Sequence, residues 1–441
     1  MRTQPAAAQP RTAWIFQGWL VVAAAFVITL LGFGSAYSFS AFVEALQRDF
    51  GASRGDVALV FSLAGFLYFG FGVISGPLAD RYGPRRLALA GMLLLALGLL
   101  LAGVAQSMTQ IYLAYGLGVG LGVGCSYVPV VGAVQRWFQR RRALASGLAV
   151  SGIGVGTLLV PPLASALIDL LGWRAAYLAL AAGVAVMGAA AARWVESPPR
   201  DRGLAPDGAP LPPPSGTAPT STGVPVRAAI RSKAFILLYL ACLVCAFGVF
   251  VPFVHLVPYA LDQGVRPGLA VLLLSMIGVG STAGRFCLGP LADRLGRRAS
   301  LAAMYAGMAA TLALWGASGQ FWTLALFALV FGVFYGGWVA LLPAVVMDYF
   351  GGRHVSGIIG VLYTSVAFGT LLGPVAAGYA YDLGGSYALP IIGAAAGNVV
   401  AAAITAFLPE SAAARRTARV KPRRCSSAEP PRRKDGAGSM R

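Results

Sequence analysis

The feature that most constrains this chain is a series of twelve apolar runs, each long enough to cross a lipid bilayer as a helix. About 20 mostly apolar residues span roughly 30 Å of hydrocarbon in helical form. Because an open sheet edge leaves backbone groups unpaired in lipid, the runs are predicted to be helices. Only 11% of the 441 residues are charged, against about 25% in a soluble domain. The sequence therefore predicts an all-α integral membrane protein, with runs at residues 18–42, 57–74, 87–105, 111–134, 144–168, 175–195, 234–260, 269–288, 301–317, 321–346, 355–380 and 387–408.

The segment between the sixth and seventh runs, residues 196–233, carries no periodic apolar face. It contains RGLAPDGAPLPPPSGTAPTSTGVPVR, rich in Pro, Gly, Ser and Thr, which is typical of a flexible linker. We therefore expect five parts: a short N-terminus (1–17), a first six-helix half (18–195), the linker (196–233), a second six-helix half (234–408) and a basic tail (409–441) that is disordered.

The two halves share sequence at a constant offset. GPLADRYGPRR begins at Gly76 and GPLADRLGRR at Gly289, 213 residues apart (289 − 76). GTLLVPPLASALIDL begins at Gly156 and GTLLGPVAAGYAYDL at Gly369, again 213 apart (369 − 156). Two parallel homologous halves are the arrangement expected of a transporter with its site between them.

The basic residues predict the orientation. If both termini are cytoplasmic, the inner loops carry 17 Lys and Arg and the outer loops carry four, as the positive-inside rule requires. The formal net charge of +19 lies mainly in these loops and in the tail. It therefore indicates topology and affinity for anionic lipid surfaces, and argues against nucleic-acid binding. We expect a multi-pass protein of the cell inner (plasma) membrane.

The repeated charged phrase carries a resemblance to a known family. Its pattern, G-x-L-a-D-R-x-G-R-R after the second run of a half, resembles the hallmark loop of the major facilitator superfamily. The resemblance implies a fold of twelve helices in two halves, and it implies that these cytoplasmic loops act as gating latches. The residues that match are Gly76, Asp80, Arg81, Gly83 and Arg86 in the first half, and Gly289, Asp293, Arg294, Gly296, Arg297 and Arg298 in the second. For Arg86, obedience to the positive-inside rule is an equal explanation.

Other segments resemble one branch of that superfamily. QGWLVVAAAFVITLLGFGSAYSFSAF in the first run, ASGLAVSGIGVGTLLVPPLASALIDLLGWRAAY in the fifth and FVPFVHLVPYALDQG in the seventh are similar to monocarboxylate transporters and their bacterial relatives, including oxalate/formate antiporters. This resemblance implies a small organic anion as substrate.

Arg285 is the only Lys or Arg well inside a predicted span, and an ionisable group there is a functional candidate by default. The position 213 residues earlier is Gly72, so the scaffold does not require an arginine. The resemblance implies that Arg285 pairs with the substrate carboxylate, a task that suits the guanidinium fork. Where mammalian-type members carry a proton-relaying Asp, one turn before this arginine, the chain has Ser281. One fixed cation favours a monocarboxylate over a dicarboxylate.

Aromatic residues are expected to shape the site. The resemblance places Tyr127 and Tyr335 near the substrate, and Tyr37, Trp338 and Tyr363 are further candidates. Interfacial or lipid-facing packing is the alternative for each of them.

His255 lies towards the outer end of the seventh run, between Pro252 and Pro258. A neutral imidazole can take up a proton near neutral pH, so His255 is the proton-coupling candidate, together with the substrate carboxylate itself. The alternative is a hydrogen-bonding core histidine.

These observations predict a secondary transporter that moves a lactate- or pyruvate-like monocarboxylate by alternating access with proton symport. An oxalate/formate-type anion exchanger or a drug-type exporter on the same fold is the alternative. The chain lacks a nucleotide-binding motif and a nucleophile–base constellation, so we expect neither an enzyme nor a cofactor or metal. We expect a monomer whose partners are the anion, the proton and the lipid bilayer.

Overall fold

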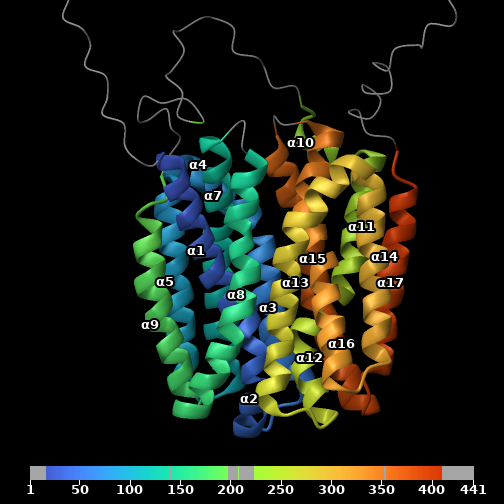
Figure 1. Ribbon diagram of the computed structural model, residues 1–441. Helices are drawn as coiled ribbons and strands as arrows, with labels where there is room; N and C mark the ends of the chain where they lie inside the picture. Colours follow the sequence, from blue (N-terminus) through green and yellow to red (C-terminus); the bar gives the residue numbers. More distant parts are fainter. Residues whose placement is uncertain (1–15, 139–141, 197–206, 208–222, 352–353, 410–441) are drawn as a thin grey trace, which may run out of the picture.

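The computed structural model is a bundle of long helices that all run roughly along one axis (Figure 1). It describes residues 16–138, 142–196, 207, 223–351 and 354–409. The described ends of the chain, near Gln17 and Ala406, lie at the same end of the bundle, which we call the terminal end. The opposite end, formed by α2, the end of α12 and the connection between α16 and α17, is called the distal end.

Within the described residues, the first half of the chain forms eleven helical segments. They are α1 Gln17–Tyr37, η1 Ser38–Phe42, α2 Val43–Phe50, α3 Arg54–Gly70, α4 Gly72–Tyr82, α5 Pro84–Gly103, α6 Met108–Ile111, the π-helical η2 Tyr112–Leu117, α7 Gly118–Trp137 and α8 Arg142–Leu171, followed by α9 Trp173–Ala192. The second half follows the short α10 Val226–Ala229 and consists of α11 Lys233–Val249, α12 Val251–Asp262, α13 Pro267–Leu295, α14 Arg297–Gly316, α15 Phe321–Phe350, α16 Val355–Gly384 and α17 Ala388–Ala406.

The twelve predicted spans are confirmed as helical segments. Within the described residues, eleven of them are long and apolar enough to cross a membrane, and the bent pair α3 and α4 brings the number to twelve. The predicted run 57–74 is this pair, bent by 40°. The run 234–260 is also divided, because α11 ends at Val249 and α12 begins at Val251, directly before Pro252. A proline suits the first turn of a helix, because the N–H that it lacks would have no partner inside the helix there.

The repeated charged phrase is mostly helical, although the sequence suggested loops. Its first copy lies in the last turns of α4 and its second copy in those of α13, and each helix ends at a glycine. Gly83 and Gly296 have φ of 87° and 91°, a region that L-residues with a side chain rarely adopt. The turn is therefore a single residue in each half.

The glycines with positive φ also record the duplication. Three pairs lie 213 residues apart, namely Gly51 and Gly264, Gly83 and Gly296, and Gly172 and Gly385. Each pair terminates equivalent helices in the two halves, so the offset that relates the sequences also relates the backbones.

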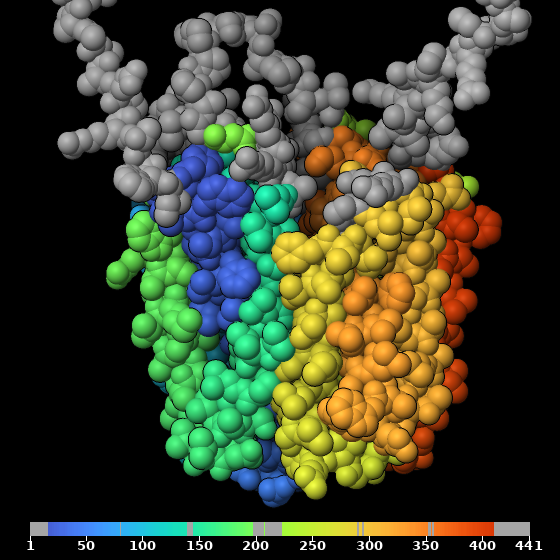
Figure 2. Space-filling model, viewed as in Figure 1, coloured from blue at the N-terminus to red at the C-terminus, as the bar shows by residue number. Residues whose placement is uncertain are grey.

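The halves lie side by side (Figure 2) and meet along two helix pairs, α3 with α16 and α8 with α13. These interfaces use equivalent residues. A Cβ added to Gly65 would meet the side chain of Thr370, and one added to Gly278 would meet the backbone of Thr157. The offset of 213 relates Gly65 to Gly278 and Thr157 to Thr370. Small residues at these positions let the helix backbones approach closely.

Parts of the predicted organisation lie outside the described residues, namely residues 1–15 of the N-terminus, most of the linker (197–206 and 208–222) and the tail after Pro409. The last part of the linker is folded rather than extended. Val224 donates its backbone N–H to the carbonyl of Phe350 at 2.9 Å, and Ala229 of α10 is fully buried.

Candidate functional site

Arg285 lies in the middle of α13 with only 5% of its surface exposed. Its Nε, Nη1 and Nη2 atoms are all buried and have no hydrogen-bond partner among the described residues. Burying an unpaired charge costs several kcal/mol, and buried polar groups are normally hydrogen-bonded. A buried guanidinium without a partner is therefore the feature of this bundle that most needs a ligand to explain it.

Four tyrosines lie near this cation. The charge of Arg285 interacts with the side chains of Tyr335, Tyr127, Tyr37 and Tyr363. Two of them also join the halves directly, because the hydroxyls of Tyr37 and Tyr335 lie 3.0 Å apart. Four of the five aromatic residues predicted from the sequence thus lie near Arg285, and the fifth, Trp338, lines the neighbouring pocket.

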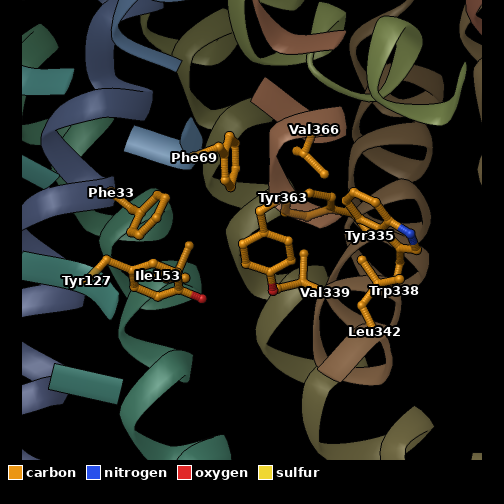
Figure 3. Close-up of a pocket in the computed structure, with 10 residues that line it drawn as sticks. All are labelled: Phe33, Phe69, Tyr127, Ile153, Tyr335, Trp338, Val339, Leu342, Tyr363 and Val366. Carbon is orange, nitrogen blue, oxygen red and sulfur yellow. The ribbon is translucent and has the colours of Figure 1, made fainter. Parts of the chain in front are cut away.

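A small pocket lies between the halves beside these tyrosines (Figure 3). Phe33 and Tyr127 of the first half face Tyr363 and Tyr335 of the second across it. Its walls are apolar and aromatic, formed by Phe33, Phe69, Tyr127, Ile153, Tyr335, Trp338, Val339, Leu342, Tyr363 and Val366. A concave apolar pocket with a few convergent polar groups is the usual form of a small-molecule site.

Trp338 contributes a wall to the pocket rather than a hydrogen bond. Its indole Nε1–H donates to the hydroxyl of Tyr305 at 3.1 Å, so the polar atom is already used within the protein. Ser281 lies one helical turn before Arg285 and is 2% exposed, and its Oγ has no hydrogen-bond partner among the described residues. The site therefore combines one cation, several hydroxyls and apolar walls, which suits a small anion with a single charged group.

His255 lies elsewhere. It is 1% exposed in α12, and both ring nitrogens are used. Nε2 donates to the carbonyl of Pro374 at 2.8 Å, and Nδ1 lies 3.1 Å from the hydroxyl of Tyr387. Among the described residues, His255 does not line the pocket. It belongs instead to a polar cluster at the distal end.

Comparisons with known proteins agree with this architecture. Residues 24–286 and 238–434 match the Major Facilitator Superfamily. The chain is 31% identical to Monocarboxylate transporter 11 of Mus musculus, over 87% of this chain and 85% of that protein. It is 33% identical to Monocarboxylate transporter 3 of Rattus norvegicus, over 85% and 76%.

The chain belongs to the Major Facilitator Superfamily. A solved member with a similar fold is a bacterial homolog to the human lysosomal transporter Spinster in an inward-facing and occupied conformation. It has a TM-score of 0.65 and 16% identity, with 88% of this chain and 96% of that chain covered. The same protein in an inward-facing and unoccupied conformation has a TM-score of 0.62 and 17% identity, with 91% and 95% covered.

The superfamily's charged phrase is only partly described at the level of side chains. Those of Asp80, Asp293 and Arg294, and the surroundings of Gly289, lie outside what the structure describes. In the second half, Arg297 Nη1 donates to Asp348 Oδ1 at 2.7 Å and to the carbonyl of Ala344 at 3.0 Å. In this member of the superfamily the start of α14 is thereby fastened to α15.

Four further residues of the phrase are placed near the terminal end. Arg298 donates to the carbonyls of Thr405 and Ala406 at the end of α17. Arg81 lies 5.4 Å from the ring centroid of Tyr82, and Arg86 is exposed. Gly76 lies inside α4, near the side chain of Val128.

Sequence reasoning missed two sets of residues in this superfamily member. The apolar walls of the pocket, such as Phe33 and Ile153, have the same composition as the rest of each span, so no sequence signal distinguishes them. The pair of Arg54 and Asp262 at the distal end did carry a signal, since Asp262 is the 213-residue counterpart of Asp49.

Proposed function

We propose that this protein is a secondary transporter that moves a small organic monocarboxylate by alternating access of one central site. The observation that carries the proposal is the buried guanidinium of Arg285, whose nitrogens have no partner in the described protein and which lies among tyrosines between the halves. A carboxylate would supply the missing charge and the missing acceptors together. The names of the relatives in the comparisons point to the same class of substrate.

The anion is bound by Arg285 with help from the hydroxyls of Tyr127 and Tyr335, and the apolar walls hold an uncharged tail. Ser281 Oγ is a further donor one turn away. Arg285 is not part of the pocket wall, but among the described residues it is the only buried Lys or Arg. A second carboxylate would therefore remain uncompensated. This favours lactate- or pyruvate-like acids over dicarboxylates.

Proton symport is the coupling that we propose, since an anion that moves with a proton crosses without net charge. His255 is the protein group proposed to carry the proton. The loop asymmetry in Lys and Arg supports cytoplasmic termini, which would place the terminal end inside the cell and the distal end outside the inner membrane. We propose a monomer, because one chain contains both halves of the site.

The test is uptake of radiolabelled lactate or pyruvate into proteoliposomes under an inward proton gradient. We expect uptake that rises with the gradient in the wild type and is lost in Arg285→Ala. Arg266→Gln is the matched control, because Arg266 is exposed at the start of the same helix and should transport normally. Normal uptake by Arg285→Ala would contradict the proposal that Arg285 binds the carboxylate of the substrate.

An organic-anion exchanger is the second candidate, and the same vesicles distinguish it. An exchanger would need unlabelled anion inside the vesicle and would ignore the proton gradient. A drug-type exporter would move apolar cations or neutral dyes and would not require Arg285.

A further inference from the structure

The duplication gives an expectation for the distal end of each half. The offset of 213 relates Asp49 to Asp262 and Arg174 to Tyr387. In the first half, Arg174 Nη1 donates to Asp49 Oδ2 at 2.7 Å, and Trp173 Nε1 donates to the same oxygen at 2.9 Å. The first half therefore neutralises its own carboxylate.

The second half lacks the equivalent cation, because position 387 is a tyrosine. Its carboxylate, Asp262, is paired with an arginine from the other half. Arg54 Nη1 donates to Asp262 Oδ2 at 2.6 Å and Nη2 donates to Oδ1 at 2.7 Å. This is the bidentate geometry in which guanidinium and carboxylate bind most strongly.

The second half also encloses the Arg54 side chain, which is 16% exposed. Its Cζ lies 4.0 Å from the ring centroid of Tyr381, a cation–π distance. Arg54 Nη1 donates to the hydroxyl of Tyr387 at 2.9 Å, and Tyr381 donates to Asp262 at 3.2 Å. The Arg54 guanidinium is therefore held by side chains from α12, from α16 and from the residue that precedes α17.

The backbone around Arg54 is docked on the same half. Asp382 accepts the backbone N–H of Arg54 at 3.1 Å and that of Gly55 at 2.9 Å, so a carboxylate of one half caps the N-terminus of a helix in the other, where it is electrostatically favoured. Tyr379 donates to Asp56 at 2.9 Å. A Cβ on Gly378 would lie 2.7 Å from the Cα of Gly55, so the two backbones are in close contact here.

We propose that Arg54 is the latch of a gate at the distal end, and that it supplies across the boundary between the halves the cation that the second half lacks. Separating the halves at this end removes, in one movement, the bidentate partner of Asp262 and the hydrogen bonds of Asp382 to the N-terminus of α3. The latch therefore favours the conformation in which the distal end is closed. This inference concerns conformation and does not depend on the identity of the substrate.

The test measures the opening of the distal end without any substrate. Spin labels are attached at Arg48→Cys and Gln320→Cys, exposed positions at the distal tips of the two halves, in a cysteine-free background in lipid nanodiscs. Pulsed electron paramagnetic resonance gives the distribution of distances between them. Arg54→Gln is expected to raise the ratio of long to short distances at least fivefold.

Two further variants make the test specific. Tyr387→Arg gives Asp262 a cation of its own half, as Arg174 does for Asp49, and is expected to shift the distances in the same direction. Arg174→Gln is the matched control, because it breaks the equivalent pair inside one half, and it should leave the distances unchanged. The double variant Arg54→Asp with Asp262→Arg should restore the short distance.

The proposal is overturned if Arg54→Gln and Tyr387→Arg leave the distances unchanged. It is also overturned if Arg174→Gln shifts them as far as Arg54→Gln does. The shift would then follow from the loss of any positive charge at the distal end, and not from loss of the Arg54–Asp262 pair. These distances are measured without substrate, whereas the proposed function is tested by transport assays. A wrong substrate assignment would therefore not alter the distances.

Discussion

The hydroxyl oxygens of Tyr37 and Tyr335 lie 3.0 Å apart, although 298 residues separate them in the chain. Both side chains are buried, and both interact electrostatically with Arg285. This hydrogen bond crosses from α1 to α15 and so joins the two halves at the cation. Any movement of one half against the other must break or rebuild it.

We predict that Tyr335→Phe weakens the affinity for the transported anion by about tenfold to a hundredfold, because one hydrogen bond to a charged group contributes about 1.5–3 kcal/mol. Tyr37→Phe removes the partner of Tyr335 and should have a smaller effect, since Arg285 remains. The measurement is the concentration dependence of uptake in proteoliposomes. A larger loss in Tyr37→Phe than in Tyr335→Phe would contradict the proposal that the hydroxyl of Tyr335, and not that of Tyr37, binds the anion.

Replacement of Arg285 by a similar apolar residue should separate stability from function. We expect Arg285→Met to abolish transport while increasing stability by about 1–4 kcal/mol, because a buried charge without a partner is replaced by an apolar chain. Thermal unfolding in detergent gives the comparison. Added monocarboxylate should stabilise the wild type and not the variant. A strongly destabilised Arg285→Met protein would mean that the arginine has an essential partner within the chain.

The contact between α8 and α13 predicts opposite effects for two glycines of one helix. A Cβ on Gly154 would lie 3.0 Å from the carbonyl oxygen of Gly278, whereas one on Gly147 would meet nothing within 4 Å. Gly154→Ala should therefore cost about 1–3 kcal/mol through overpacking. Gly147→Ala should be neutral or stabilise by up to about 1 kcal/mol, through reduced chain entropy in the unfolded state. Equal melting temperatures for the two variants would contradict the close approach.

The hydrogen bonds of His255 predict how pH acts on the distal end. A carbonyl only accepts, so Nε2 of His255 bears the hydrogen that is donated to Pro374. A guanidinium only donates, so the hydroxyl of Tyr387 accepts from Arg54 and donates its own hydrogen to Nδ1 of His255. This arrangement requires a neutral imidazole. Protonation would place a second donor against the hydroxyl of Tyr387, where Arg54 repels the imidazolium and Asp382 attracts it. Because the closed arrangement uses the neutral ring, acid should favour opening.

The check is the pH dependence of the distance between the two spin labels, measured from neutral pH down to about pH 4. His255→Gln should flatten the profile. His354→Gln is the matched control, because His354 is the other of the two histidines and is exposed; it should leave the profile as in the wild type. A profile that persists in His255→Gln would assign the pH response to another group.

The amino-acid sequence by itself determined the spans, the duplication and the rarity of charge that singles out Arg285. These properties are local or periodic. A bilayer requires about 20 apolar residues per crossing, and a constant offset between similar segments can be read without coordinates. Even the repeated charged phrase was recognisable, although the residues expected to form a loop continue α4 and α13 to a single glycine in each half.

Only the tertiary structure decided which residues meet between the halves. Tyr37 with Tyr335, and Arg54 with Asp262, are brought together by helices that are distant in the chain, and no periodicity relates them. The apolar walls of the pocket were likewise invisible, because lipid-facing and pocket-facing residues have the same composition in a membrane helix. His255 illustrates the difference most clearly: its position near Pro252 and Pro258 was evident from the sequence, but its bond to Tyr387, and through it to Arg54, depends on packing across three helices.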